Sequence, residues 1–89
     1  VGPVMRKGDM GDAVVEAIYE DNAGRKIVIE EHASYFRIKV EDECLVKMAT
    51  VSEMLGSDVT FSDLEASMPS FEGFIRVETE QVKFLSKSD

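Results

Sequence analysis

The sequence predicts a small single α+β domain in which helices cover a mainly antiparallel sheet. Residues 35–40 alternate apolar and charged side chains, which is the period of a strand with one buried face. Residues 10–18 carry apolar side chains at the spacing of an amphipathic helix. The length of 89 residues suits one domain, so residues 1–89 are expected to form one unit. The expected order is βαββ, then short helices and a C-terminal β-hairpin.

The N-terminal segment is expected to form an edge strand followed by a helix. Val4 and Met5 follow Pro3, which has no N–H to donate and therefore favours the edge of a sheet. Asp9 is a suitable N-cap for the helix. The stretch 21–24 should end the helix, because Asn and Gly both tolerate left-handed backbone angles. The apolar stripe expected to face the sheet consists of Met10, Ala13, Val14, Ala17 and Ile18.

The middle of the chain, residues 27–48, is expected to form a meander of three consecutive antiparallel strands. The clearest strand places Phe36, Ile38 and Val40 on its buried face and Arg37 and Lys39 on the other. Shorter apolar runs lie on either side of it. An acidic segment at residues 41–43 is a poor strand former and a suitable turn. The rest of the chain should pack on the apolar face of this meander.

Two short helices and a hairpin are expected after the meander. The segment Thr50-Val51-Ser52-Glu53 matches a capping box, and Gly56 should end the helix that it begins. Thr60 to Asp63 offers a second N-terminal signal, and this helix should stop before Pro69. Residues 74–77 and 81–85 are expected to pair as the final hairpin, and residues 87–89 are expected to fray.

The composition excludes several classes of function. The net charge of −8 would repel a nucleic-acid backbone. No apolar run approaches the roughly 20 residues that span a bilayer, so membrane insertion is not expected. The single Cys44 cannot form an internal disulfide, which favours a reducing cytoplasm. A chain of this length can bury one small core but not a deep enclosed active site.

No residue pattern predicts catalysis, a cofactor or a metal site. His32 is the only histidine and is expected at the surface, and one His with one Cys cannot form a structural zinc site. The acidic pairs are adjacent in sequence, so neighbours on a strand would point to opposite faces. Met5 and Met68 have no core assignment and are candidates for an adaptable contact surface. The sequence therefore predicts a module that acts through its surface rather than an enzyme.

Five segments of the chain carry a resemblance to a known family. They are Val1 to Asp9, Glu20 to Gly24, Val28 to Ile38, Thr50 to Gly56, and the Ser70-Phe71-Glu72-Gly73 loop. Together they resemble the effector (coupling, regulatory) proteins of soluble bacterial multicomponent diiron monooxygenases. The resemblance spans nearly the whole chain and is nearest to the toluene and alkene branch. Ala23 stands where the family often has Pro, and His32 where an Arg is common.

The resemblance implies a protein without a cofactor that binds the diiron hydroxylase component and catalyses nothing alone. Such a protein alters the hydroxylase active site and couples electron transfer and O₂ activation to hydroxylation of hydrocarbons such as arenes, phenols or alkenes. The family's matching loop lies at the hydroxylase contact. The expected partner-binding residues are therefore Met68, Pro69, Ser70, Phe71, Glu72 and Gly73. The free protein is expected to be a monomer.

Two other classes of function stay open at the level of sequence. A small-molecule-sensing regulatory domain of the ACT kind has a similar strand and helix count. It would need a homodimeric sheet and a glycine-bearing turn after the first strand, and residues 8–11 offer a weak match. The other class is an acidic protein that masks a basic surface of its target. An obligate dimer would favour the sensor, and a monomer that joins a large hydroxylase would favour the effector.

Overall fold

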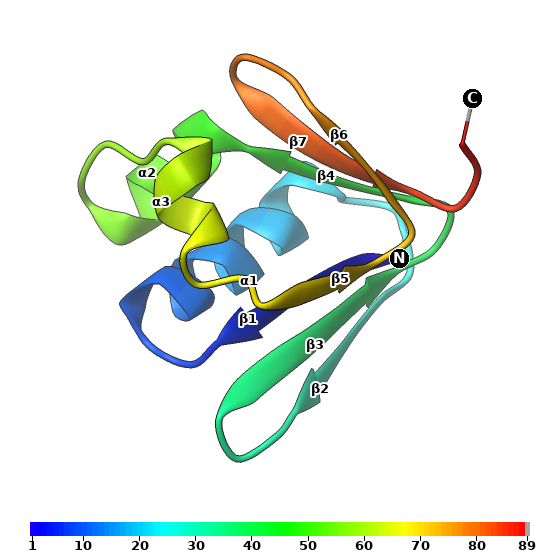
Figure 1. The fold of residues 1–89 in the computed structure, drawn as a ribbon, viewed down its shortest axis with the longest axis horizontal. Coiled ribbons are helices and arrows are strands. Elements are labelled where there is room, and N and C mark those ends of the chain that lie inside the picture. Colours follow the sequence, from blue (N-terminus) through cyan, green and yellow to red (C-terminus); the bar gives the residue numbers. More distant parts are fainter. Residues whose placement is uncertain (89) are drawn as a thin grey trace.

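A computed structural model describes residues 1–88. Asp89, the last residue of the segment expected to fray, lies outside the described residues. The fold is the expected α+β class, with antiparallel strands, helices and a C-terminal hairpin (Figure 1). Along the chain the elements are β1 (Gly2–Arg6), α1 (Asp9–Asp21), β2 (Ile27–Glu31), β3 (Tyr35–Val40), β4 (Glu43–Lys47), α2 (Met48–Leu55), α3 (Phe61–Glu65), β5 (Ser70–Glu72), β6 (Phe74–Val77) and β7 (Gln81–Leu85).

The strands form two antiparallel sheets rather than one. One sheet has the order β2-β3-β1-β5, and the other has the order β4-β7-β6. In Figure 1 the sheets lie close together where β5 passes into β6, and they diverge toward the opposite end. Helix α1 lies between them and contacts β1, β3 and β4, while α2 packs against α1. Two sheets therefore bury their inner faces on one central helix.

The predicted three-stranded meander is wrong in its last strand. β2 pairs with β3 as expected, from Ile27 opposite Val40 to Glu31 opposite Phe36. The chain then turns at Asp42, whose φ of 67° lies in the left-handed region. After this turn β4 enters the other sheet and pairs with β7. The physical reason is that α1 offers apolar surface to both sheets, so β4 gains a covered face by leaving β3.

The predicted edge position of β1 is also wrong, because this strand lies between β3 and β5. The register with β3 runs from Val4 opposite Arg37 to Arg6 opposite Tyr35. Pro3 lies before this register and faces Phe71 of β5, so its missing N–H does not interrupt the β1–β3 pairing. A proline near the start of a strand can thus be accommodated at the centre of a sheet.

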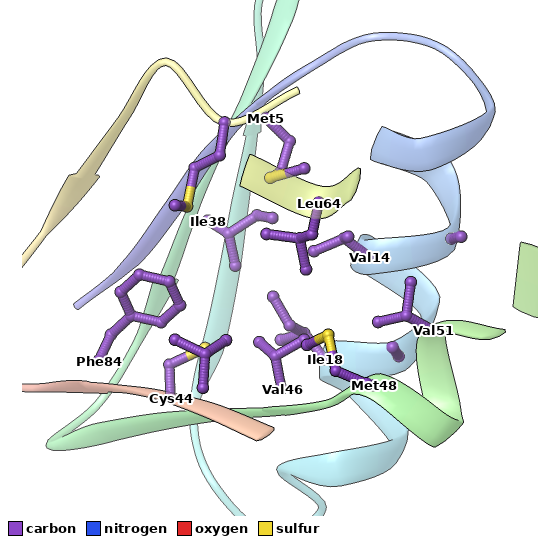
Figure 2. Close-up of a cluster of buried hydrophobic side chains, with 14 of the residues drawn as sticks. Met5, Val14, Ile18, Ile38, Cys44, Val46, Met48, Val51, Leu64 and Phe84 are labelled. Atoms are coloured by element: carbon purple, nitrogen blue, oxygen red, sulfur yellow. The ribbon is translucent and has the colours of Figure 1, made fainter. Parts of the chain in front are cut away.

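The core confirms the predicted register of β3. Ile38 and Val40 are buried, whereas Arg37 and Lys39 remain partly exposed. Figure 2 shows side chains from both sheets meeting those of α1, and the fully buried Cys44 is among them. The large core side chains include Met5, Val14, Ile18, Ile38, Val46, Leu64 and Phe84. Met5 is fully buried, so its proposed role as a surface contact is wrong.

The helix termini match the sequence signals in part. Helix α1 begins at Asp9 with Gly8 as the N-cap, so the predicted cap is one residue out, and it ends at Asp21 within the predicted stretch. The predicted capping box at Thr50 is wrong, because α2 already begins at Met48. A capping box does form at the start of α3, where Thr60 and Asp63 bond each other's backbone N–H groups at 3.3 and 2.9 Å.

Two further predictions for the C-terminal half are confirmed. Gly56 ends α2 with a left-handed φ of 85°. β6 and β7 pair as a hairpin with the predicted bounds, from Phe74 opposite Leu85 to Val77 opposite Val82. Among the residues described, no helix is long and apolar enough to cross a membrane.

Candidate protein-docking surface

The side chains most often used in catalysis are either buried or dispersed in this fold. Cys44 is buried in the core, and this burial raises the pKa of its thiol to about 12, so the nucleophilic thiolate is suppressed. His32 is exposed beside β2, and its ring stacks on Tyr35 at 4.5 Å between centroids. Within residues 1–88 no group of three or more His, Cys, Asp or Glu side chains could hold a metal ion.

The six residues predicted to bind a partner divide into a buried anchor and an exposed strand. Met68 is only 8% exposed and belongs to the core, so its predicted place on the contact surface is wrong. An apolar residue just before a strand can either pack in the core or contact a partner. The side chain of Met68 packs in the core. The exposed members are Pro69, Ser70, Phe71, Glu72 and Gly73.

Phe71 has both a structural and a surface role. Its ring packs on that of Phe84 at 5.7 Å between centroids, with the planes tilted by 52°. The same side chain remains 39% exposed. A ring held from below by another aromatic side chain is presented in one orientation, and such rigid, half-exposed aromatic groups suit an interface anchor.

Two further exposed apolar residues lie on the next strand, β6. Phe74 is 52% exposed and Val77 is 51% exposed. The sequence places both residues in a hairpin strand and does not predict their exposure. No sequence signal was available for this exposure, because only the strand order β4-β7-β6 shows that β6 is an edge strand. We call the set Ser70, Phe71, Glu72, Gly73, Phe74 and Val77 the docking edge.

Gly73 forms the corner between the two parts of the docking edge. Its φ is 102°, and a Cβ atom at this position would lie 2.7 Å from the carbonyl oxygen of Leu85. A larger residue is therefore excluded by both conformation and space. The corner turns the chain from one sheet into the other and joins two edge strands, β5 and β6, in a continuous strip.

Ion pairs hold the opposite edge of the β2-β3-β1-β5 sheet. Lys39 lies 3.1 Å from Glu30, and the hydrogen bond that it donates lowers the pKa of the Glu30 carboxyl. Lys7 lies 2.8 Å from Glu31 and lowers the pKa of that carboxyl in the same way. These ion pairs are exposed, so they orient side chains around the β2–β3 hairpin and contribute little to the free energy of unfolding.

A buried core, an exposed apolar edge and scattered polar side chains are typical of a small binding module. The comparison with protein families agrees: the chain belongs to the MmoB/DmpM family, whose model matches residues 1–85. This membership confirms the resemblance drawn from the sequence and decides against the ACT-like alternative.

The proteins similar to this chain include an effector subunit and a chain of a hydroxylase complex. The effector subunit of the alkene monooxygenase system of Xanthobacter autotrophicus (strain ATCC BAA-1158 / Py2) is 34% identical over 88 residues, covering 99% of this chain and 87% of that protein. A chain in the structure of a phenol hydroxylase–regulatory protein complex superimposes with a TM-score of 0.83 at 21% identity. This superposition covers 96% of this chain and 95% of the other, and it establishes the shared fold.

Proposed function

We propose that this chain is the effector protein of a multicomponent hydrocarbon monooxygenase and acts by binding the diiron hydroxylase component. The observation that carries the proposal is the family match over residues 1–85, together with the similarity of nearly the whole chain to an alkene monooxygenase effector subunit. The fold is consistent with a role that needs no catalytic side chain. The chain therefore regulates a reaction whose chemistry takes place in its partner.

The physical mechanism is a shift of population within the hydroxylase. A ligand that binds one conformation of its partner more tightly draws the partner toward that conformation. The shift in the equilibrium between two hydroxylase conformations is set by the difference in the effector's binding free energy for them. A difference of about 1–3 kcal/mol changes that equilibrium by a factor of roughly 5–150. In this way the effector would couple electron transfer and O₂ activation to hydroxylation without touching the substrate.

The docking edge is the part of this chain proposed to contact the hydroxylase. Phe71 supplies a ring that Phe84 holds in place, and Phe74 and Val77 add exposed apolar side chains on the next strand, β6. Ser70 and Glu72 precede and follow Phe71 along β5, and they present polar groups on the other face of this strand. Met68 contributes indirectly, because its burial fixes the start of β5.

The test is a titration of hydroxylase activity with effector at a fixed supply of electrons. Phe74→Ala and Ser70→Asp should each require several-fold more effector for half-maximal coupled turnover, because both side chains are exposed on the docking edge. Phe71→Ala should have the larger effect, about tenfold or more, and a modest loss of stability from its contact with Phe84.

Tyr19→Ala is the matched control, since Tyr19 is an exposed aromatic residue on α1 rather than on the docking edge. Circular dichroism confirms the fold of each variant. Wild-type saturation by both Phe74→Ala and Ser70→Asp would show that another surface binds the hydroxylase. A wild-type chain that leaves hydroxylase turnover and product coupling unchanged would refute the proposed function itself.

The substrate class and the compartment are further parts of the proposal. Similarity to an alkene monooxygenase effector supports an alkene or arene as the substrate of the complete enzyme. Assay of the reconstituted system with propene and toluene distinguishes these two. The single reduced Cys44 in the core supports a cytoplasmic protein.

A further inference from the structure

We propose that the outer face of the β2-β3-β1-β5 sheet holds a carboxylate side chain of the hydroxylase between Arg6 and Arg37. This inference rests on the proposed function and adds the chemistry of a second contact beside the docking edge. The site is a surface hollow of about 300 Å³. Val4 contributes to its lining together with the two arginines, Tyr35, Ser34 and Ser70.

The strand register brings these side chains together. Val4 of β1 lies opposite Arg37 of β3 on one side and opposite Ser70 of β5 on the other. Arg6 lies opposite Tyr35 in a neighbouring row. Residues directly opposite one another in antiparallel strands present their side chains on the same face of the sheet. Met5, between Val4 and Arg6, is buried in the core, so this face is the one turned away from α1.

The charge of this hollow is opposite to that of the chain as a whole. The chain has 18 acidic and 10 basic residues, yet the hollow is lined by Arg6 and Arg37 and by no acidic residue. Three other surface hollows each have acidic residues in their lining. Those residues are Asp58 and Glu80, Asp42 and Glu43, and Asp9, Asp12 and Glu16. Local sign reversal of this kind is what complementarity to a partner's acidic group requires.

Both arginines retain donors for a ligand. Arg6 donates one hydrogen bond, from Nη1 to the carbonyl oxygen of Ala66 at 3.1 Å. Arg37 Nε lies 4.0 Å from Glu30, which is longer than a hydrogen bond, and Glu30 is already paired with Lys39 at 3.1 Å. A guanidinium carries five N–H groups, so most of those on each arginine remain for an incoming acceptor.

A carboxylate fits this arrangement, and a partner protein is its source. Guanidinium groups bind carboxylates through paired N–H donors. Tyr35 and Ser70, which both carry a hydroxyl, line the same hollow. Ser70 belongs to the docking edge as well, so the hollow continues the surface proposed to contact the hydroxylase. An acidic group placed here would fix the orientation of the complex, because the rest of this chain would repel it.

The test compares the affinity of effector variants for the hydroxylase by isothermal titration calorimetry at 50 and 200 mM salt. Arg37→Glu should raise the dissociation constant about tenfold or more, and should weaken its dependence on salt. Arg37→Lys should give an intermediate value, because Lys keeps the charge but not the paired donors. Lys26→Glu is the matched control: it makes the same change in charge at an exposed residue outside the hollow, and should change affinity less than about twofold.

Arg37→Gln removes the positive charge without reversing it. This variant serves as the test if Arg37→Glu lowers the melting temperature of the protein. Equal affinity of wild type and Arg37→Gln at both salt concentrations would overturn this inference and leave the proposed function intact. Wild-type protein that does not bind the hydroxylase would overturn both. Binding of acetate or phosphate in the hollow at millimolar concentration, with hydroxylase affinity insensitive to Arg37→Gln, would show a site for free anions and would overturn the assignment to a partner.

Discussion

Replacing Asn22 by alanine should destabilise this protein more than any other single change to a polar side chain at the end of α1. Asn22 is 3% exposed and makes three hydrogen bonds of 2.8 Å. Its Nδ2 donates to the carbonyl oxygens of Ile18 and Leu45, and its Oδ1 accepts from the N–H of Leu45. The side chain thus completes the outer edge of β4 and ties it to α1.

The size of the effect follows from which partners lose their bonds. The carbonyl oxygen of Ile18 keeps the hydrogen bond from the backbone N–H of Asn22, so it is not left alone. Leu45 loses the bonds to both its N–H and its carbonyl oxygen, and each unsatisfied buried group costs about 1–3 kcal/mol. Because these groups are partly buried, we expect Asn22→Ala to lower the free energy of unfolding by about 2–4 kcal/mol. For a domain of this size that corresponds to a melting temperature roughly 10–25 °C lower.

Thermal unfolding followed by circular dichroism measures this loss, with Glu20→Ala as a control at an exposed position of the same helix. The control should stay within about 0.5 kcal/mol of wild type. Asn22→Asp sharpens the test, because it keeps the acceptor for Leu45 but turns a carboxylate oxygen toward two carbonyl oxygens. The pKa of the new carboxyl would therefore be raised by folding, and the deficit in stability should shrink as the pH falls. A melting temperature of Asn22→Ala within about 2 °C of wild type would refute the reasoning.

Three other outcomes follow from the same structure. Ile38→Ala should cost about 2–5 kcal/mol in urea unfolding, since Ile38 is 1% exposed, and a wild-type midpoint would contradict the register of β3. Thr50→Ala should cost only about 0.5–1.5 kcal/mol, because Thr50 donates a 2.7 Å hydrogen bond to Asp21 instead of capping α2. A double-mutant cycle with Asp21→Ala should show that the two losses in stability are not additive. Hydrogen bonds from Thr60 hold the pKa of Asp63 below its ordinary value of 3.8. The ionised Asp63 carboxylate therefore contributes its full stability above pH 3.8, and this contribution is lost as the pH falls through the lowered pKa. An NMR titration that gives Asp63 a pKa at or above 3.8 would contradict the capping box.

Local features were determined by the sequence itself. The alternation in residues 35–40 specified which face of β3 is buried, because a shift of one residue would expose every apolar side chain. The helical spacing in residues 10–18 specified α1, and the hairpin of β6 and β7 has the predicted bounds. The resemblance that carried the function was also present in the sequence, since family membership depends on residue identity along the chain.

The pairing of strands was decided only by the tertiary structure. Apolar strands such as β3 and β4 present the same pattern whether they pair with each other or lie in different sheets, and contact of both sheets with α1 separates them. The same limit applies to the threonine signals. Thr60 caps a helix, whereas Thr50 lies within one, because α2 already begins at Met48.

The surfaces proposed for binding were determined partly by the sequence and partly by the tertiary structure. The Ser70 to Gly73 segment was predicted from the sequence, but the burial of Met68 and the exposure of Phe74 were not, because the sequence does not say which side of an edge strand is covered. Arg6 and Arg37 lie far apart in the chain and carry no motif. Only the register of β1 with β3 places them on one face of a sheet, where two cations can share one ligand.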